Sequence, residues 1–247
     1  MIDGRQRKNV EIGLSVEIIQ NPQQRSGVLT KGVFAKTNGL EKVLEDIDAV
    51  TDHIKEHHPK LPIIMLGHSM GSILTLRYCI DNSDKIDAAM LLNSGVDGGP
   101  LLMVLRGLIK IAKAMKGSDV PAVLITKLTF DEWNKKFKPN RTDFDWLSRD
   151  EAEVDKYVAD PLCGFDCSIA TWIGLLDALT RIASDGALSQ MNKDLPIYVF
   201  SGTEDPVGEQ AKGVKRLLRQ YDKHGFANVT PRFYEGARHE LFNETNR

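Results

Sequence analysis

The chain has 247 residues, of which 42% are hydrophobic, and its formal net charge is −2. This length and composition can build one sizeable hydrophobic core, with room for an inserted subdomain. The small net charge gives no electrostatic basis for a nucleic-acid partner, and no stretch is long and apolar enough to cross a bilayer.

Two features of the sequence bear on its compartment. Residues 1–20 are charged and lack the apolar core of a signal peptide. The three cysteines, Cys79, Cys163 and Cys167, are odd in number and do not have the spacing of metal ligands. Free thiols are typical of reducing compartments, so we expect a cytoplasmic protein without a metal site.

The first predicted elements are a strand and a helix. Residues 10–19 alternate loosely between apolar and polar side chains, which favours a strand, and residues 21–27 form a turn-rich connector. From Asn38 onward, apolar residues recur at helical spacing as far as Ile54, and Pro59 lies beyond the end. This pattern predicts an amphipathic helix packed on a sheet, with Asn38 as its cap.

The segment GHSMG, residues 67–71, joins a short apolar run to a helical pattern. Residues 61–66 have the composition of a buried strand, and residues 72–80 have apolar side chains that suit a buried helix. A strand, a sharp turn and a helix around G-x-S-x-G indicate a nucleophile elbow, whose glycines prevent collisions where the strand and the helix fold back on each other. The turn holds Ser69 in a strained conformation above the sheet edge. Ser69 is therefore the candidate nucleophile.

A second buried strand is predicted within residues 85–95. Because it follows the elbow helix, the sheet is expected to be parallel. The next strand pattern begins only at residue 195. We therefore expect an α/β core made of residues 1–96 and 195–247, with a helical cap inserted at residues 97–194.

The first helix of this insertion is predicted over residues 101–116. It has a basic face of Arg106, Lys110 and Lys113 opposite an apolar face that includes Leu105. Such a helix either rests on a lipid surface or packs on its own domain, and the second alternative is the more ordinary one.

Two more helices are expected later in the insertion. Residues 148–158 begin with Ser148 and Glu151 at the spacing of a capping box. Residues 167–183 are longer and more apolar. Four of their side chains either line an apolar pocket or belong to the core: Trp172, Leu175, Leu176 and Leu179.

Two charged residues follow the last predicted strands. Asp205 lies just past a strand at residues 195–202, and His239 lies just past the next strand. The order Ser, Asp, His is that of an α/β-hydrolase, and the carboxyl ends of parallel strands meet at one sheet edge, so the three side chains can converge. His239 would take the proton of Ser69, and Asp205 would orient the imidazole. Glu204 is the reserve acid.

Three segments carry a family resemblance: GHSMGS at residues 67–72, SGTEDPVG at 201–208 and YEGARHELFNE at 234–244. They resemble the monoacylglycerol lipase and lysophospholipase branch of the α/β-hydrolases, which is also grouped with the serine aminopeptidase S33 fold. The similarity covers roughly residues 33–247 and includes DPLCGF at 160–165, which resembles a cap segment.

The resemblance implies an α/β-hydrolase fold with a helical cap over the site and an ester substrate with an acyl chain. It also implies that Ser69, Asp205 and His239 act as nucleophile, acid and base. The family carries a His-Gly segment after an early strand, whose backbone N–H supplies half of the oxyanion hole, and this sequence has none before Gly67. The expected oxyanion donor is therefore the backbone N–H of Met70, the residue after the nucleophile.

Compared with the resembled family, the chain looks shortened at both ends, with its first strands missing. We therefore expect the elbow strand to have an open edge, unless residues 10–19 fill it, and the protein to self-associate. The sequence predicts hydrolysis of carboxylic esters of the monoacylglycerol or lysophospholipid type, without a cofactor. The alternatives are a weakly active or non-catalytic remnant that binds acyl ligands and, less favoured, an aminopeptidase.

Overall fold

The structure is a computed structural model that describes residues 32–35, 37–94, 100–184 and 186–247. The strand and connector predicted at residues 10–19 and 21–27 lie outside the described residues.

Four parallel strands form the sheet, in the order β1-β2-β3-β4. Each one lies within or overlaps a stretch for which the sequence predicts a strand, and each connection between them contains at least one helix, as parallel pairing requires. The strands are β1 (Ile64–His68), β2 (Ala88–Leu92), β3 (Ile197–Gly202) and β4 (Val229–Tyr234). In the register, Gly67 faces Leu91 and Leu91 faces Val199. The predicted parallel sheet is thus confirmed.

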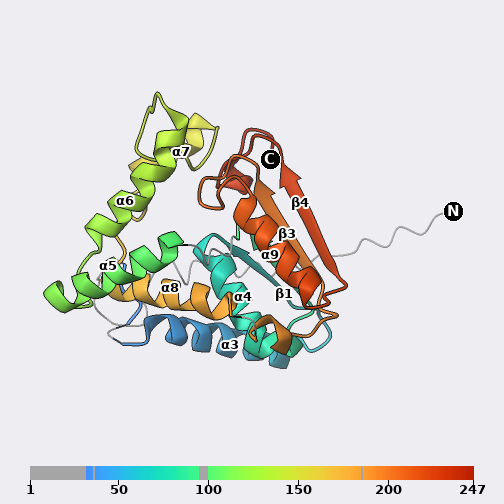
Figure 1. The fold of residues 1–247 in the computed structure, drawn as a ribbon. Helices are drawn as coiled ribbons and strands as arrows, with labels where there is room; N and C mark the ends of the chain where they lie inside the picture. The colour runs from blue at the N-terminus through green and yellow to red at the C-terminus, as the bar shows by residue number, and fades with distance from the viewer. Residues whose placement is uncertain (1–31, 36, 95–99, 185) are drawn as a thin grey trace.

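The helices surround this sheet and extend away from it. Those that the structure describes are α3 (Gly39–His57), α4 (Met70–Asn82), α5 (Pro100–Lys116), α6 (Val123–Asn134), α7 (Glu151–Ala159), α8 (Ile169–Ile182) and α9 (Lys212–Lys223). In Figure 1, α5, α6 and α7 stand away from the sheet at the left, and α8 lies between α3 and α5. Within the described ranges, no helix combines the length and the apolar character needed to span a membrane.

The main hydrophobic core lies between the sheet and its flanking helices. Leu76 and Tyr78 of α4 meet Leu91 and Val199 of the sheet, and Leu217 of α9 joins the same cluster. All five side chains are almost fully buried. Burial of this kind contributes about 1.5–3 kcal/mol for each large apolar side chain, and it fixes the strand ends that carry the polar residues described below.

Helix α8 connects the insertion to the rest of the fold. At one end, Ile169 and Leu176 pack with Ile109 of α5, while Ala178 packs with Leu74 of α4 in a separate cluster. Leu176 is 3% exposed, so the core alternative holds for this residue rather than the pocket alternative. The division into residues 97–194 and a surrounding core stays a prediction, since α8 shares clusters with both parts.

Two predicted helix caps differ from the observed ones. The capping box of Ser148 and Glu151 is wrong, because Asp150 is the N-cap of α7 and accepts a hydrogen bond from Ala152 N. The Ser148 hydroxyl instead donates to Asn243 O at 2.6 Å and accepts from Asp150 N. Asn38 does precede α3, but with a left-handed φ of 51° and no capping hydrogen bond from its side chain.

Candidate active site

Ser69 lies in the sharp turn between β1 and α4. Its backbone has φ 53° and ψ −118°, a conformation that costs about 1–3 kcal/mol for a residue other than glycine. Gly67 makes the turn possible, because a Cβ at this position would lie 2.2 Å from Gly71 O and 2.5 Å from Thr75 Oγ1. Ser69 N donates to Leu92 O at 3.1 Å, which ties the turn to the end of β2.

Three side chains predicted from separate parts of the sequence meet at this turn. His239 Nε2 lies 2.8 Å from Ser69 Oγ, and His239 Nδ1 lies 2.9 Å from Asp205 Oδ1. Because the carboxylate is an acceptor only, Nδ1 carries the proton and Nε2 is free to accept from the hydroxyl. Asp205 and His239 are both buried. The reserve acid Glu204 is exposed instead, so Asp205 is the carboxylate that meets the imidazole.

The surroundings of His239 change its basicity. Burial alone would lower the pKa of His239, but the charge of Asp205 and the hydrogen bond from Nδ1 to its carboxylate raise this pKa above the ordinary value. Asp205 Oδ1 also accepts from Val207 N at 3.0 Å, which holds the carboxylate in place. The arrangement therefore strengthens the imidazole as a proton acceptor.

The backbone carbonyl of His239 is held by two neighbouring strand ends. His68, the last residue of β1, places Nε2 3.0 Å from His239 O, and Asn93 Nδ2 donates to the same oxygen. Asn93 Oδ1 in turn accepts from Gly202 N at 3.0 Å. Burial, and repulsion from the His239 imidazole when that ring is protonated, lower the pKa of His68, which favours a neutral ring that donates from Nε2.

The ends of β1 and β2 therefore bind one carbonyl in the loop after β4, and Asn93 links the end of β3 to the same group. Neither His68 nor Asn93 was predicted from the sequence. Asn93 could have been found from the sequence, because it is a polar residue directly after a buried strand.

An aromatic group packs beside the imidazole. The Trp146 ring centroid lies 5.1 Å from that of His239 and 4.9 Å from that of Trp133, and Phe130 completes the group. Trp146 is buried. No sequence pattern indicated this contact, because Trp146 is 93 residues before His239 and stands outside any regular helix or strand.

The predicted oxyanion donor lies at the start of a helix. Met70 is the first residue of α4, and the first N–H groups of a helix have no partner within the helix. They also stand at the positive end of the helix dipole, which favours a developing negative charge. The position of Met70 N–H therefore suits an oxyanion, and its role stays a prediction.

Metal-binding groups and reactive thiols offer no second chemical site among the described residues. Among the described residues there is no group of three or more His, Cys, Asp or Glu side chains that could hold a metal ion. The three cysteines are free, and burial raises the pKa of the Cys79 thiol to about 12. Neither feature competes with the arrangement around Ser69 as a chemical site.

Comparisons with known proteins identify a family and several similar proteins. A family model described as serine aminopeptidase, S33, matches residues 25–246. A second model, described as an uncharacterized conserved protein, matches residues 3–37. Monoglyceride lipase from Mus musculus is 28% identical over 219 residues, which are 87% of this chain and 63% of the mouse protein. The chain thus spans less than two thirds of the length of this relative.

Two solved structures have a similar fold. One is a thermostable carboxyl esterase from Bacillus coagulans in complex with glycerol, with a TM-score of 0.72 and 25% sequence identity. The alignment covers 81% of this chain and 64% of the esterase chain. The other is a lipase in its open form, with a TM-score of 0.77 and 25% sequence identity. The alignment covers 91% of this chain and 72% of the lipase chain.

Proposed function

Because the chain belongs to the serine aminopeptidase S33 family and has the α/β-hydrolase fold, we propose that it is a serine hydrolase that cleaves carboxylic esters. The proposed substrates are monoacylglycerols or lysophospholipids. The observation that carries the proposal is the hydrogen-bonded chain from Ser69 through His239 to Asp205, with distances of 2.8 and 2.9 Å. The relatives named above are lipases and esterases, which supports an ester over other substrates.

The proposed mechanism begins with acylation of Ser69. Ser69 Oγ attacks the ester carbonyl carbon while His239 Nε2 takes the hydroxyl proton, and Asp205 stabilises the resulting imidazolium. The negative charge that develops on the carbonyl oxygen is stabilised by the backbone N–H of Met70. When the C–O bond of the ester breaks, His239 gives its proton to the leaving alcohol, and an acyl-enzyme remains.

Deacylation repeats these steps with water. His239 removes a proton from the water that attacks the acyl-enzyme, and Ser69 leaves with that proton as the free acid forms. Met70 N–H is the one oxyanion donor that the described part of the chain identifies. Loss of one donor typically lowers kcat by about 10²–10³-fold, so the Met70 N–H is expected to contribute strongly to turnover.

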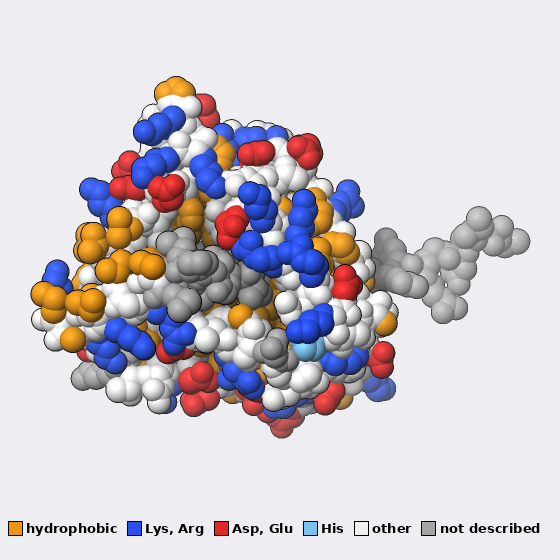
Figure 2. Space-filling model, in the orientation of Figure 1, with side chains coloured by type: hydrophobic (Ala, Val, Ile, Leu, Met, Phe, Trp, Pro, Cys, Tyr) orange, Lys and Arg blue, Asp and Glu red, His pale blue; other side chains and the backbone are white. Residues whose placement is uncertain are grey.

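The insertion is proposed to cover the site and to contact lipid. Leu105, Ile109 and Ala112 of α5 face inward, and Arg106 pairs with Asp177 of α8 at 2.7 Å. A second apolar face of α5 remains exposed together with side chains of α6, and Figure 2 shows these hydrophobic side chains gathered at the left of the molecule. The exposed residues are Val104, Leu108, Ile111, Met115, Val123, Leu124 and Leu128.

The helix α5 therefore packs on its own domain and still presents an apolar face to its surroundings. Its lysines at positions 110, 113 and 116 accompany that face. Apolar side chains flanked by lysines suit the surface of an anionic bilayer, where acyl esters are found. This supports a peripheral contact with lipid as part of the proposed function.

Aminopeptidase activity and a non-catalytic remnant are the competing functions. The name of the family points to an aminopeptidase, whereas the lipase and esterase relatives favour an ester. We expect the protein to hydrolyse a short p-nitrophenyl ester and to leave an aminoacyl p-nitroanilide uncleaved, and Ser69→Ala to abolish the ester activity. Faster cleavage of the amide would contradict the esterase proposal, and cleavage of neither substrate would favour the remnant.

A further inference from the structure

The loop that carries His239 is fastened to a segment of the insertion. Residues 238–244, here the His239 loop, bond at several points to residues 145–149, here the brace segment. Glu240 N donates to Leu147 O at 2.7 Å, and Ser148 Oγ donates to Asn243 O at 2.6 Å. The side chain of Arg238 donates to Ser148 O at 3.0 Å. About 90 residues of sequence separate the two segments, so only the fold brings them together.

Glu244 is the charged centre of this contact. It is 2% exposed, and its carboxylate accepts from Arg149 Nε at 2.7 Å and from Arg238 N at 2.8 Å. Arg149 N lies at 3.4 Å from the same carboxylate. A buried carboxylate needs such partners, because an ion that loses its partner in the interior keeps its full desolvation penalty.

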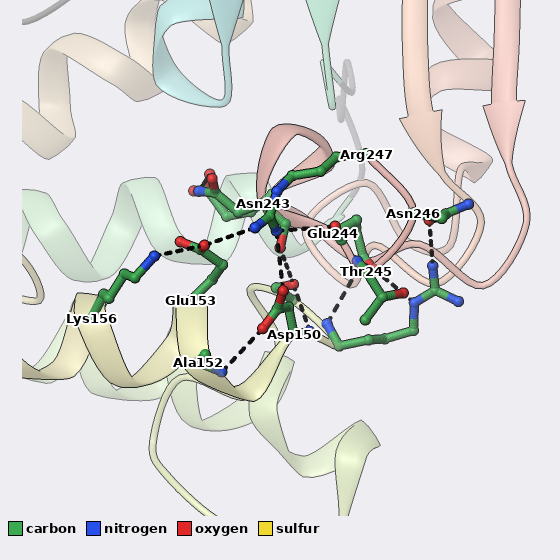
Figure 3. A network of polar contacts seen from close by, with 12 residues as sticks. Asp150, Ala152, Glu153, Lys156, Asn243, Glu244, Thr245, Asn246 and Arg247 are labelled. Atoms are coloured by element: carbon green, nitrogen blue, oxygen red, sulfur yellow. Dashed lines mark hydrogen bonds and ion pairs between the residues drawn. The ribbon is translucent and has the colours of Figure 1, made fainter.

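The rest of the network lies on the outside of this pair. Figure 3 shows Arg247 reaching from the chain end toward Asp150 and Glu153, with Lys156 at the periphery. Arg247 is about half exposed and Lys156 more so. Solvated ion pairs of this kind contribute little to stability. The pair of Glu244 and Arg149 differs from these, because its carboxylate is buried and the Arg149 side chain is only about one third exposed, so it is the part that can control geometry.

This pair acts on His239 from two sides. Arg238 N belongs to the residue directly before His239, so its bond to Glu244 fixes the backbone from which the imidazole extends. The brace segment also contains Trp146, whose ring lies 5.1 Å from the His239 ring. A shift of the loop against the brace segment would thus move the imidazole relative to both Ser69 and Asp205.

We propose that Glu244 is a positioning residue that, through Arg149, locks the His239 loop to the brace segment and sets the place of the His239 imidazole. The insertion then does more than cover the substrate, because it holds the base. The rate effects expected from this role rest on the proposed ester hydrolysis, whereas the effect on the imidazole itself does not.

The test compares Glu244→Gln and Arg149→Met with the control Lys156→Met. Glutamine keeps the shape and one acceptor oxygen for Arg238 N, and methionine keeps the stem of Arg149 without its charge. Lys156→Met removes the ion pair between Lys156 and Glu153, which lies in the same network. Among the described hydrogen bonds and ion pairs, neither of these two side chains binds directly to the His239 loop. We expect Glu244→Gln and Arg149→Met to lower kcat for a short p-nitrophenyl ester by up to about 10²-fold. KM should change little, and the control should match the wild type.

Two further measurements separate positioning from stability and from activity. The double variant Arg149→Met/Glu244→Gln leaves no unpaired buried charge, so we expect it to be more stable than Arg149→Met and to keep the low kcat. The proton on His239 Nδ1 is expected far downfield in the NMR spectrum, because it is bonded to Asp205. This signal should move or broaden in Glu244→Gln and stay unchanged in Lys156→Met, whether or not the protein turns over esters.

The outcomes distinguish the two proposals. An inactive wild type whose Nδ1 proton responds to Glu244→Gln would overturn the proposed function and support the positioning role. A wild-type kcat and an unmoved Nδ1 proton in Glu244→Gln would overturn the positioning role. Recovery of kcat together with stability in the double variant would also overturn it, since Glu244 would then act only on folding.

Discussion

The basicity of His239 results from two opposing effects on one imidazole. The ring is buried, which disfavours its charged form, but the Asp205 carboxylate 2.9 Å from Nδ1 favours that form more strongly and raises the pKa. A general base works only when it is unprotonated. The rate should therefore fall as pH decreases through the raised pKa of His239, above the ordinary histidine value of about 6.5.

Asp205→Asn tests this electrostatic account. Asparagine keeps the size of the side chain and removes the charge, so burial would then dominate and lower the pKa of His239. We expect the acidic limb of the kcat/KM profile to move to lower pH, while kcat falls by up to about 10⁴-fold. Glu204→Gln is the matched control, because Glu204 is exposed and its substitution should leave the limb in place. A limb that stays in place in Asp205→Asn would contradict the account.

At the scale of elements, the strands were the most readable part of the sequence. Short apolar runs predicted β1, β2 and β3, because the strands of a parallel sheet are commonly buried on both faces, whereas β4 is an edge strand of the described sheet whose residues are exposed or half-buried. The observed strands are shorter than some of the predicted stretches, as in β2, which occupies Ala88–Leu92 of the predicted residues 85–95. The polar residues after these strands, Ser69, Asp205 and His239, were found for the same reason, since each follows a recognisable run.

The contacts made by irregular segments could not be predicted in this way. Trp146 and Glu244 have no periodic neighbours, and their partners are about 90 residues away in the sequence. The N-cap of α7 was misassigned because Ser148 and Asp150 are both residue types that suit an N-cap. The hydrogen bond from the Ser148 hydroxyl to Asn243 O exists only in the folded chain. Tertiary contacts decided these positions, and local pattern carried no information about them.

The exposed face of α5 leads to a prediction about lipid binding. Ile111 and Met115 are 58% and 77% exposed, and burying such side chains in a bilayer is worth about 1.5–3 kcal/mol each. We expect Ile111→Ser to weaken cosedimentation with anionic phospholipid vesicles by about tenfold or more. Leu61→Ser is the control, because Leu61 is also exposed and lies just before β1. Equal losses in the two variants would show that α5 has no special role.

At the scale of the whole molecule, the fold gathers three strand ends and one loop around a single carbonyl and a single imidazole. The family resemblance inferred from the motifs is confirmed, and so is the α/β-hydrolase fold. The roles of the residues in the site and the boundaries of the cap stay predictions. The brace between the insertion and the His239 loop emerged only from the assembled structure.

The edge of the sheet gives a prediction about assembly. Among the described residues, β1 pairs on one side only, with β2, and Ile64 on this strand is 57% exposed. An open apolar edge favours pairing with another chain, so we expect sedimentation to show self-association that increases with concentration. Ile64→Lys should weaken it, because a charge on an edge strand opposes pairing. A monomer at every concentration would contradict this expectation.

The most direct test of the central claim is to find which residue reacts with a fluorophosphonate probe. The account predicts one adduct on the peptide that contains Ser69, no labelling of Ser69→Ala, and much slower labelling of His239→Ala, because the hydroxyl would lose its proton acceptor. Mass spectrometry of the digested protein identifies the site. Labelling that persists in Ser69→Ala, or a wild type that is not labelled at all, would contradict the claim that Ser69 is an activated nucleophile.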